Sequence, residues 1–148
     1  MLKQFSTEHE KLRDALAELR ATADLIATNP DSPDCVGALR ATHRRLAEEI
    51  LPHERAEEER LYPALAGPLG GPAATSTMSR AHVEIHRLVD RLDGHLRQVA
   101  DSRLRPDQVP DLLANLYGLD AILRLHFTQE EEDFFALRST AGPGGPAG

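Results

Sequence analysis

Six side chains of the kinds that bind metals recur at a fixed offset in this chain. Each half has one early histidine and one later histidine that is followed four residues on by a glutamate, and the halves are 73 residues apart. The six residues are His9, His53 and Glu57 in the first half and His82, His126 and Glu130 in the second. Such a match at a fixed offset indicates an internal repeat.

The spacing of each later pair points both side chains in the same direction. On an α-helix, a residue four positions on lies about 40° round the axis and ~6 Å along it. Two buried carboxylates would repel each other, and each would cost several kcal/mol or take up a proton. A pair of dications between them removes this cost. Imidazole mixed with carboxylate suits iron, with zinc or manganese also possible, and two bridging carboxylates suit two metals about 3.5 to 4 Å apart.

Apolar residues spaced three and four apart predict long helices that would carry these side chains. We expect four of them, over residues 6–27, 34–65, 76–101 and 107–138. Thr7 and Glu10 offer a capping box for the start of the first helix. Pro52 lacks a backbone donor and predicts a kink in the second helix, one residue before His53.

Two short connections and one moderate one favour an all-α fold, an up-down-up-down antiparallel four-helix bundle built from two pseudo-repeated helical hairpins. The moderate connection is the Gly- and Pro-rich stretch 67–78. Early histidines lie near the starts of their helices and late ones about 20 residues into theirs, so antiparallel pairing brings all four to one end. His9 and His53 are 44 residues apart, as are His82 and His126.

The composition indicates one soluble domain. We expect residues 1–138 to form the bundle and residues 139–148 to form a flexible tail. The net charge of −7 leaves no broad basic surface for nucleic acid or for an anionic membrane. No apolar run is long enough for a membrane span or a signal peptide, and the single Cys35 fits a reducing compartment. We therefore expect a cytoplasmic monomer or weak homodimer.

The order of the six residues resembles the hemerythrin family of HHE cation-binding domains. The resemblance covers nearly the whole chain, from about His9 to Phe135, and includes the segment Leu-Tyr-Pro-Ala-Leu after the first glutamate run. It implies a di-iron centre with an oxo or hydroxo bridge. Four residues would be terminal ligands and two would be bridges: His9, His53, His82 and His126, and Glu57 and Glu130, respectively.

Two features depart from the simple repeat. His86 adds the His-x-x-x-His pattern of the oxygen-carrying branch and is a further candidate ligand, although Arg13 stands at its repeat position. In oxygen carriers the last helix usually presents its carboxylate five residues after the histidine, where this chain has Glu131. We prefer Glu130 as the bridge because it preserves the repeat.

Other polar residues near these positions favour different roles. The neighbouring glutamates are predicted to form a solvated acidic face: Glu58, Glu59, Glu131 and Glu132. His43 lies ~15 Å from the His53 level and is predicted to be a hydrogen-bonded core residue, and His95 is predicted to lie on the surface. Tyr62 either packs or contacts a ligand.

The resemblance implies several activities: reversible O₂ binding, peroxide decomposition, nitric oxide handling, and oxygen or iron sensing. We expect a non-haem di-iron protein that binds or reduces O₂ or peroxide, and catalase- or peroxidase-like turnover stays open. The alternative is a redox-inactive module that binds zinc, buffers iron or senses it. The small ligand would be O₂, peroxide or nitric oxide.

Overall fold

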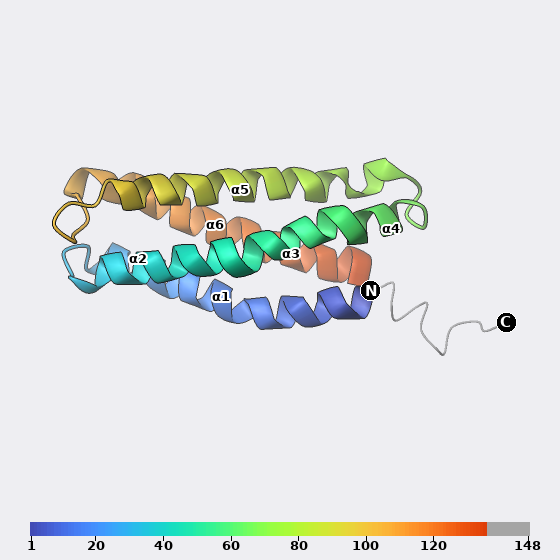
Figure 1. Ribbon diagram of the computed structural model, residues 1–148, viewed down its shortest axis with the longest axis horizontal. Helices are drawn as coiled ribbons and strands as arrows, with labels where there is room; N and C mark the ends of the chain where they lie inside the picture. The colour runs from blue at the N-terminus through green and yellow to red at the C-terminus, as the bar shows by residue number, and fades with distance from the viewer. Residues whose placement is uncertain (136–148) are drawn as a thin grey trace.

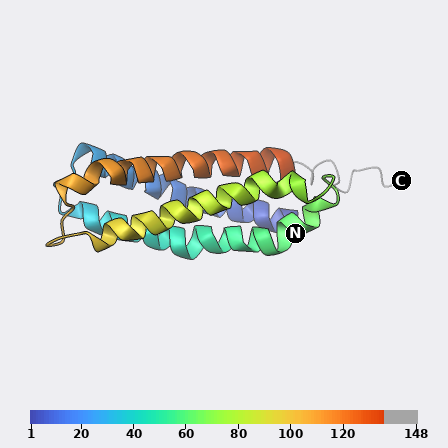
Figure 2. The same ribbon diagram turned by 90° about the horizontal axis from the view of Figure 1, so that it is seen from above.

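The computed structural model describes residues 1–135, and most of them lie in helices. They form four antiparallel helical segments, here called arms, which are α1, the run from α2 to α4, α5, and α6 with its flanking turns. α5 packs against both α6 and the arm that contains α2 (Figures 1 and 2). The α-helices are α1 (Leu2–Thr28), α2 (Asp34–Arg45), α3 (Leu51–Ala56), α4 (Tyr62–Ala66), α5 (Ser76–Arg97) and α6 (Val109–Glu130). The predicted fold class, an up-down-up-down four-helix bundle, is confirmed.

The first helix starts one turn earlier than the sequence predicts. α1 begins at Leu2, and the hydroxyl of Thr7 donates to the carbonyl of Lys3 at 2.9 Å, so the predicted capping box is wrong. The cause is packing. Phe5 is fully buried in a small apolar cluster with Leu61, and this contact holds the first turn in the helix.

The second arm is a continuous helix that widens twice. A π-helical turn, Leu46–Ile50, precedes Pro52, and a second one, Glu57–Leu61, precedes Pro63. Proline cannot donate to the regular ladder, and a wider turn accommodates the missing hydrogen bond. At Pro52, where a kink is predicted, the structure has a π turn just before the proline, and the π turn before Pro63 was not predicted.

The second hairpin follows the prediction at its start and departs from it at the turn. α5 begins at Ser76 after the 3₁₀ turn Pro72–Thr75, but it ends at Arg97 rather than at residue 101. Asp101 and Ser102 adopt positive φ values of 52° and 61°, which a continuing helix does not allow.

The last arm contains a 3₁₀ turn, α6 and a π turn. It begins with Pro106–Gln108, continues as α6 with Pro110 in the first turn as expected, and ends in the π turn Glu131–Phe135. The predicted end of this helix near residue 138 and the tail 139–148 lie outside the described residues.

Two apolar clusters fill the bundle, and a polar layer separates them along each arm. On α1, Phe5 belongs to the small cluster and Leu12 to the large one, with His9 between them. On α5, Met78 and Ile85 flank His82 in the same way. In the part of the chain that the structure describes, no helix has the length and apolar character needed to cross a membrane.

Candidate metal centre

All six side chains of the repeat meet in this polar layer. None of them is more than 6% exposed. They come from all four arms: His9 on α1, His53 on α3, Glu57 at the start of the following π turn, His82 on α5, and His126 and Glu130 on α6. Both glutamates stand at a boundary between an α-helix and a π turn, and such turns often occur at functional sites.

The imidazole Nε2 atoms point at the two carboxylates. Nε2 of His126 lies 3.1 Å from Glu130 Oε1, and Nε2 of His9 lies 3.2 Å from the same oxygen. Glu57 contacts Nε2 of three histidines at 3.2 to 3.6 Å, those of His9, His53 and His82.

These atoms form two overlapping groups that could each hold a metal ion. One group consists of Glu57, His82, His126 and Glu130, and the other of His9, His53 and Glu57. Within each group the candidate ligand atoms all lie within 4.8 Å of one another. Because Glu57 belongs to both groups, it is placed as a bridging carboxylate would be.

Carboxylates outside the cluster hold two of the rings by their other nitrogen. His53 Nδ1 lies 2.7 Å from Glu8 Oε2, and His82 Nδ1 lies 2.9 Å from Glu58 Oε1. Such contacts set the tautomer and the direction of a metal-binding histidine, leaving Nε2 to face inward. Glu58 is itself oriented by the hydroxyl of Ser79, which donates to it at 2.9 Å.

Glu131 lies beside the cluster. Its Oε1 is 3.7 Å from His9 Nδ1 and accepts a hydrogen bond from Arg13 at 2.5 Å. The structure therefore brings Glu130, rather than Glu131, against the Nε2 atoms of His9 and His126.

Two aromatic side chains enclose the centre. The Tyr62 hydroxyl donates to Glu130 Oε2 at 2.6 Å, lies 3.2 Å from His82 Nε2, and its ring stacks on the His82 ring. Phe127 stacks on His9 with ring centroids 4.2 Å apart. The contact of Tyr62 with a candidate ligand agrees with one of its two predicted roles.

Burial and close like charges set the protonation of the metal-free centre. Burial, together with the adjacent Glu130 carboxylate, raises the pKa of Glu57 to about 10. Burial also disfavours ionised Glu130, but contacts with His126 and His9 outweigh it and hold its pKa below the usual value. Burial and the nearby His126 lower the pKa of His82 to about 3. The two carboxylates thus carry one proton between them and the imidazole of His82 is neutral.

The cluster has the unmet polar groups that a cation would satisfy. Neither carboxylate oxygen of Glu57 makes a hydrogen bond, nor do Glu130 Oε1 and His53 Nε2. Buried polar groups without hydrogen bonds are costly, and buried charges in proteins are paired or coordinate metals. Neutral imidazole combined with carboxylate fits iron, zinc or manganese. The residues present therefore fit a pair of metal ions.

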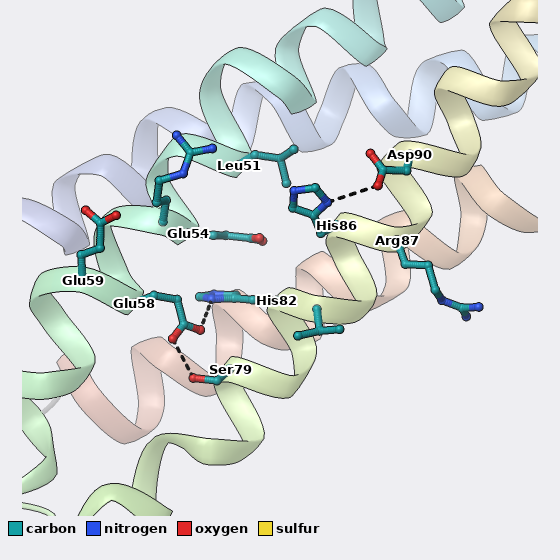
Figure 3. A pocket seen from close by; sticks show the side chains of 11 residues that line it. Leu51, Glu54, Glu58, Glu59, Ser79, His82, His86, Arg87 and Asp90 are labelled. Carbon is teal, nitrogen blue, oxygen red and sulfur yellow. Dashed lines mark hydrogen bonds and ion pairs between the residues drawn. The ribbon is translucent and has the colours of Figure 1, made fainter.

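The seventh predicted ligand, His86, is not brought into the cluster. Its side chain is 58% exposed, and Nδ1 lies 3.5 Å from Asp90 Oδ2 (Figure 3). It follows His82 by one turn of α5 and lines a surface groove that lies between α3 and α5.

Glu54 is a buried residue of this region that the sequence analysis missed. It is 4% exposed, its Oε1 makes no hydrogen bond, and it extends from α3 toward α5 near His82 and His86 (Figure 3). Burial, followed by the charges of Glu130 and Glu58, raises its pKa well above the usual value. The internal repeat indicates that Glu54 is buried, because its equivalent position in the second half is Phe127, a buried aromatic residue.

Two histidines outside the centre differ from their predictions. His95 is buried, not on the surface, because Asp111 and Gln108 from the next arm fold over it. Its Nε2 lies 2.6 Å from Asp111 Oδ2. His43 is only partly buried, with Nε2 3.9 Å from Asp93, so the prediction of a core histidine is wrong.

A four-helix bundle whose arms all send histidine or glutamate into one polar layer defines a class of cation-binding helical proteins. Residues 1–137 match the family model for the Hemerythrin HHE cation binding domain, and the chain belongs to this family. No curated protein and no solved structure matches the chain.

Proposed function

We propose that this protein is a non-haem di-iron protein that binds or reduces O₂ or peroxide. One observation carries the proposal: four imidazole Nε2 atoms converge on two buried carboxylates, and Glu57 is common to both candidate metal groups. A site of this kind holds two metals close together around a shared carboxylate. When bound, an iron pair supplies the two electrons that, with two protons, reduce one peroxide molecule to two of water.

Each half of the repeat would supply the two histidines of one metal position. His9 and His53 would hold one iron, His82 and His126 the other, and Glu57 would bridge them. Glu130 lies among the Nε2 atoms of His9 and His126, which supports the second bridging role.

His86 stays a prediction as a ligand. It would have to turn away from Asp90 and toward Glu54 before it could reach the centre. The buried carboxyl of Glu54 also lies near His82 (Figure 3), so Glu54 is a second candidate for a seventh ligand.

The surrounding residues orient the ligands and keep bulk water away. The Tyr62 phenol donates to Glu130 Oε2 and holds that carboxylate in one orientation. Ile50, Ile85 and Leu123 are fully buried in the large cluster on one side of the centre. Phe5 and Leu61 close the other side. A dry apolar surround favours small neutral ligands over bulky or charged ones.

Metal analysis and absorption of the purified protein test the proposal. We expect two irons per chain after anaerobic loading with ferrous iron, and a near-ultraviolet band that changes when azide is added to the oxidised protein. The iron-loaded protein should consume peroxide, and the same protein loaded with zinc should not. Iron that binds weakly, or at one per chain without such a band, would contradict a di-iron centre.

A redox-inactive zinc or iron-buffering module is the second candidate. It is favoured by the group of Glu57, His82, His126 and Glu130, since four ligand atoms from nitrogen and oxygen donors suit the tetrahedral preference of zinc. A protein that takes up zinc in preference to iron, at one ion per chain, would support this reading.

A further inference from the structure

A groove on the outside of the bundle leads to the metal centre from one side. It has a volume of about 710 Å³ and lies between the arm of α3 and α5 (Figure 3). Glu54 and His82 lie at its inner end, and Leu51 and Val83 supply apolar surface on its two walls. Val83 is 70% exposed, an unusual position for a large apolar side chain in the described part of the bundle.

The groove on the other side of α3 is smaller and more polar. It has a volume of about 380 Å³, lies between α1 and α3, and reaches His53. Lys11 and Arg60 line it, and its inner end is closed by the contact of 2.7 Å between His53 and Glu8. The α3–α5 groove has a corresponding contact of 2.9 Å between His82 and Glu58. It differs at Glu54, whose buried Oε1 lies beside this contact and has no hydrogen-bond partner.

The charges along the α3–α5 groove are mainly negative. Three acidic side chains on its outer walls carry this charge, Glu58, Glu59 and Asp90, against two arginines, Arg55 and Arg87. Glu54 does not contribute to it, because burial raises its pKa and favours the neutral carboxyl. Arg87 already forms an ion pair of 2.6 Å with Glu84, a residue that does not line the groove. A cleft lined by one sign of charge lowers the local concentration of ions of the same sign. Anions are therefore disfavoured along the walls of the groove.

We propose that this groove is the access route for small neutral oxidants such as hydrogen peroxide and O₂, and that its acidic wall discriminates against anions. The inference rests on the proposed function, since it concerns the ligand of that centre. Val83 and Leu51 limit the size of what enters, and Glu59 contributes to the selection by charge.

The first experiment blocks each groove in the iron-loaded protein. The variant Val83→Trp should slow both peroxide consumption and azide binding by about tenfold or more, because a bulky ring then stands in the route. Lys11→Trp fills the other groove, and Leu125→Trp places the same ring on an exposed apolar position of α6 that lines neither groove. Both controls should keep the wild-type rates, and all three variants should keep the wild-type iron content.

The second experiment tests selection by charge with a pair matched by the repeat. Glu59→Lys lies in the groove, whereas Glu132→Lys makes the same change at the equivalent exposed position outside it. At low salt, Glu59→Lys should accelerate azide binding about threefold or more and leave the peroxide rate unchanged. The gain should vanish near 1 M salt, where the Debye length is about 3 Å.

The outcomes separate the route from the metal centre. Wild-type protein that holds no iron would overturn the proposed function and this inference together. Equal rates of peroxide consumption and azide binding in iron-loaded wild type and Val83→Trp would overturn the access route alone. If Lys11→Trp slows these reactions instead, access is through the other groove. Equal acceleration of azide binding by Glu59→Lys and Glu132→Lys would overturn selection by the groove wall.

Discussion

The two ring nitrogens of His53 and of His82 have different tasks in the candidate metal centre. Nε2 of His53 and of His82 faces the shared Glu57, while Nδ1 of each ring contacts a glutamate outside the cluster. The tautomer and the ring direction are therefore set before a metal arrives, which reduces the reorganisation needed for binding.

The repeat supplies a matched test of which glutamates bind metal. Glu57→Ala and Glu130→Ala should each lower the iron content, because each removes a buried carboxylate from the candidate metal groups. Glu59→Ala and Glu132→Ala remove exposed carboxylates of the same acidic runs and should keep the wild-type content. Iron content is measured after desalting. Equal losses in all four variants would mean that the acidic runs bind metal as a diffuse charge.

His86 is tested by its own substitution. In His86→Ala the six interior side chains remain, so we expect wild-type iron content and an unchanged azide-bound spectrum. The variant loses only an exposed imidazole and its contact with Asp90. A shifted spectrum, or iron that a chelator removes faster, would place His86 among the ligands and would show that its side chain turns inward when metal binds.

At the scale of the elements, the first turn of α1 depends on burial rather than on a cap. α1 has no side-chain cap, and Phe5 is fully buried against residues of the second arm. The same turn leads directly to Glu8 and His9, so its packing also positions one histidine of the cluster and the carboxylate that holds His53.

Truncating Phe5 should therefore destabilise the protein and weaken the centre. Phe5→Ala should lower the free energy of unfolding by about 3 to 5 kcal/mol, as expected for removing a buried aromatic ring. Leu2→Ala, in the same turn but only partly buried, should give a clearly smaller loss. Urea unfolding of the metal-free proteins measures both. Equal effects would mean that the turn frays and that Phe5 contributes little.

For the whole molecule, the metal-free centre couples stability to pH. The folded-state pKa of Glu57, about 10, lies above its ordinary value of 4.5, so the folded protein holds a proton there that the unfolded chain has lost. Its contribution to stability is complete below pH 4.5 and declines as the pH rises to about 10. Glu54 and His9 have raised pKa values and act in the same direction. His82 opposes them only between about pH 3 and 6.5.

Metal-free protein should therefore become less stable between pH 7 and pH 9.5. The expected slope is up to about 1.4 kcal/mol per pH unit for each proton involved. Glu57→Gln, which keeps the shape and cannot ionise, should show a shallower slope. Bound metal replaces the proton, so added iron should raise the melting temperature, most strongly at high pH. Melting curves with and without a chelator measure this. Identical curves would remove the support for a buried metal centre.

The sequence alone determined the pattern of arms and the six converging side chains. Apolar spacing predicts which face of each helix turns inward, and the repeat places His9 level with His53 and His82 level with His126. Because short connections force neighbouring helices to run antiparallel, equal separations along the chain become equal depths in the bundle. These features depend on periodicity and length, which are properties of the chain itself.

Only the tertiary structure decided which residues at the edge of a helix's inward face are buried in the bundle. A residue at the edge of the inward face of a helix can point into the core or into a groove, depending on how the neighbouring helix is placed. His86 and Glu54 stand at that boundary; the packing of α3 against α5 leaves His86 exposed and buries Glu54. His95 is buried for the same reason, because Gln108 and Asp111 from the next arm cover it. Rotation and separation of helices depend on contacts between distant parts of the chain, and no local pattern records them.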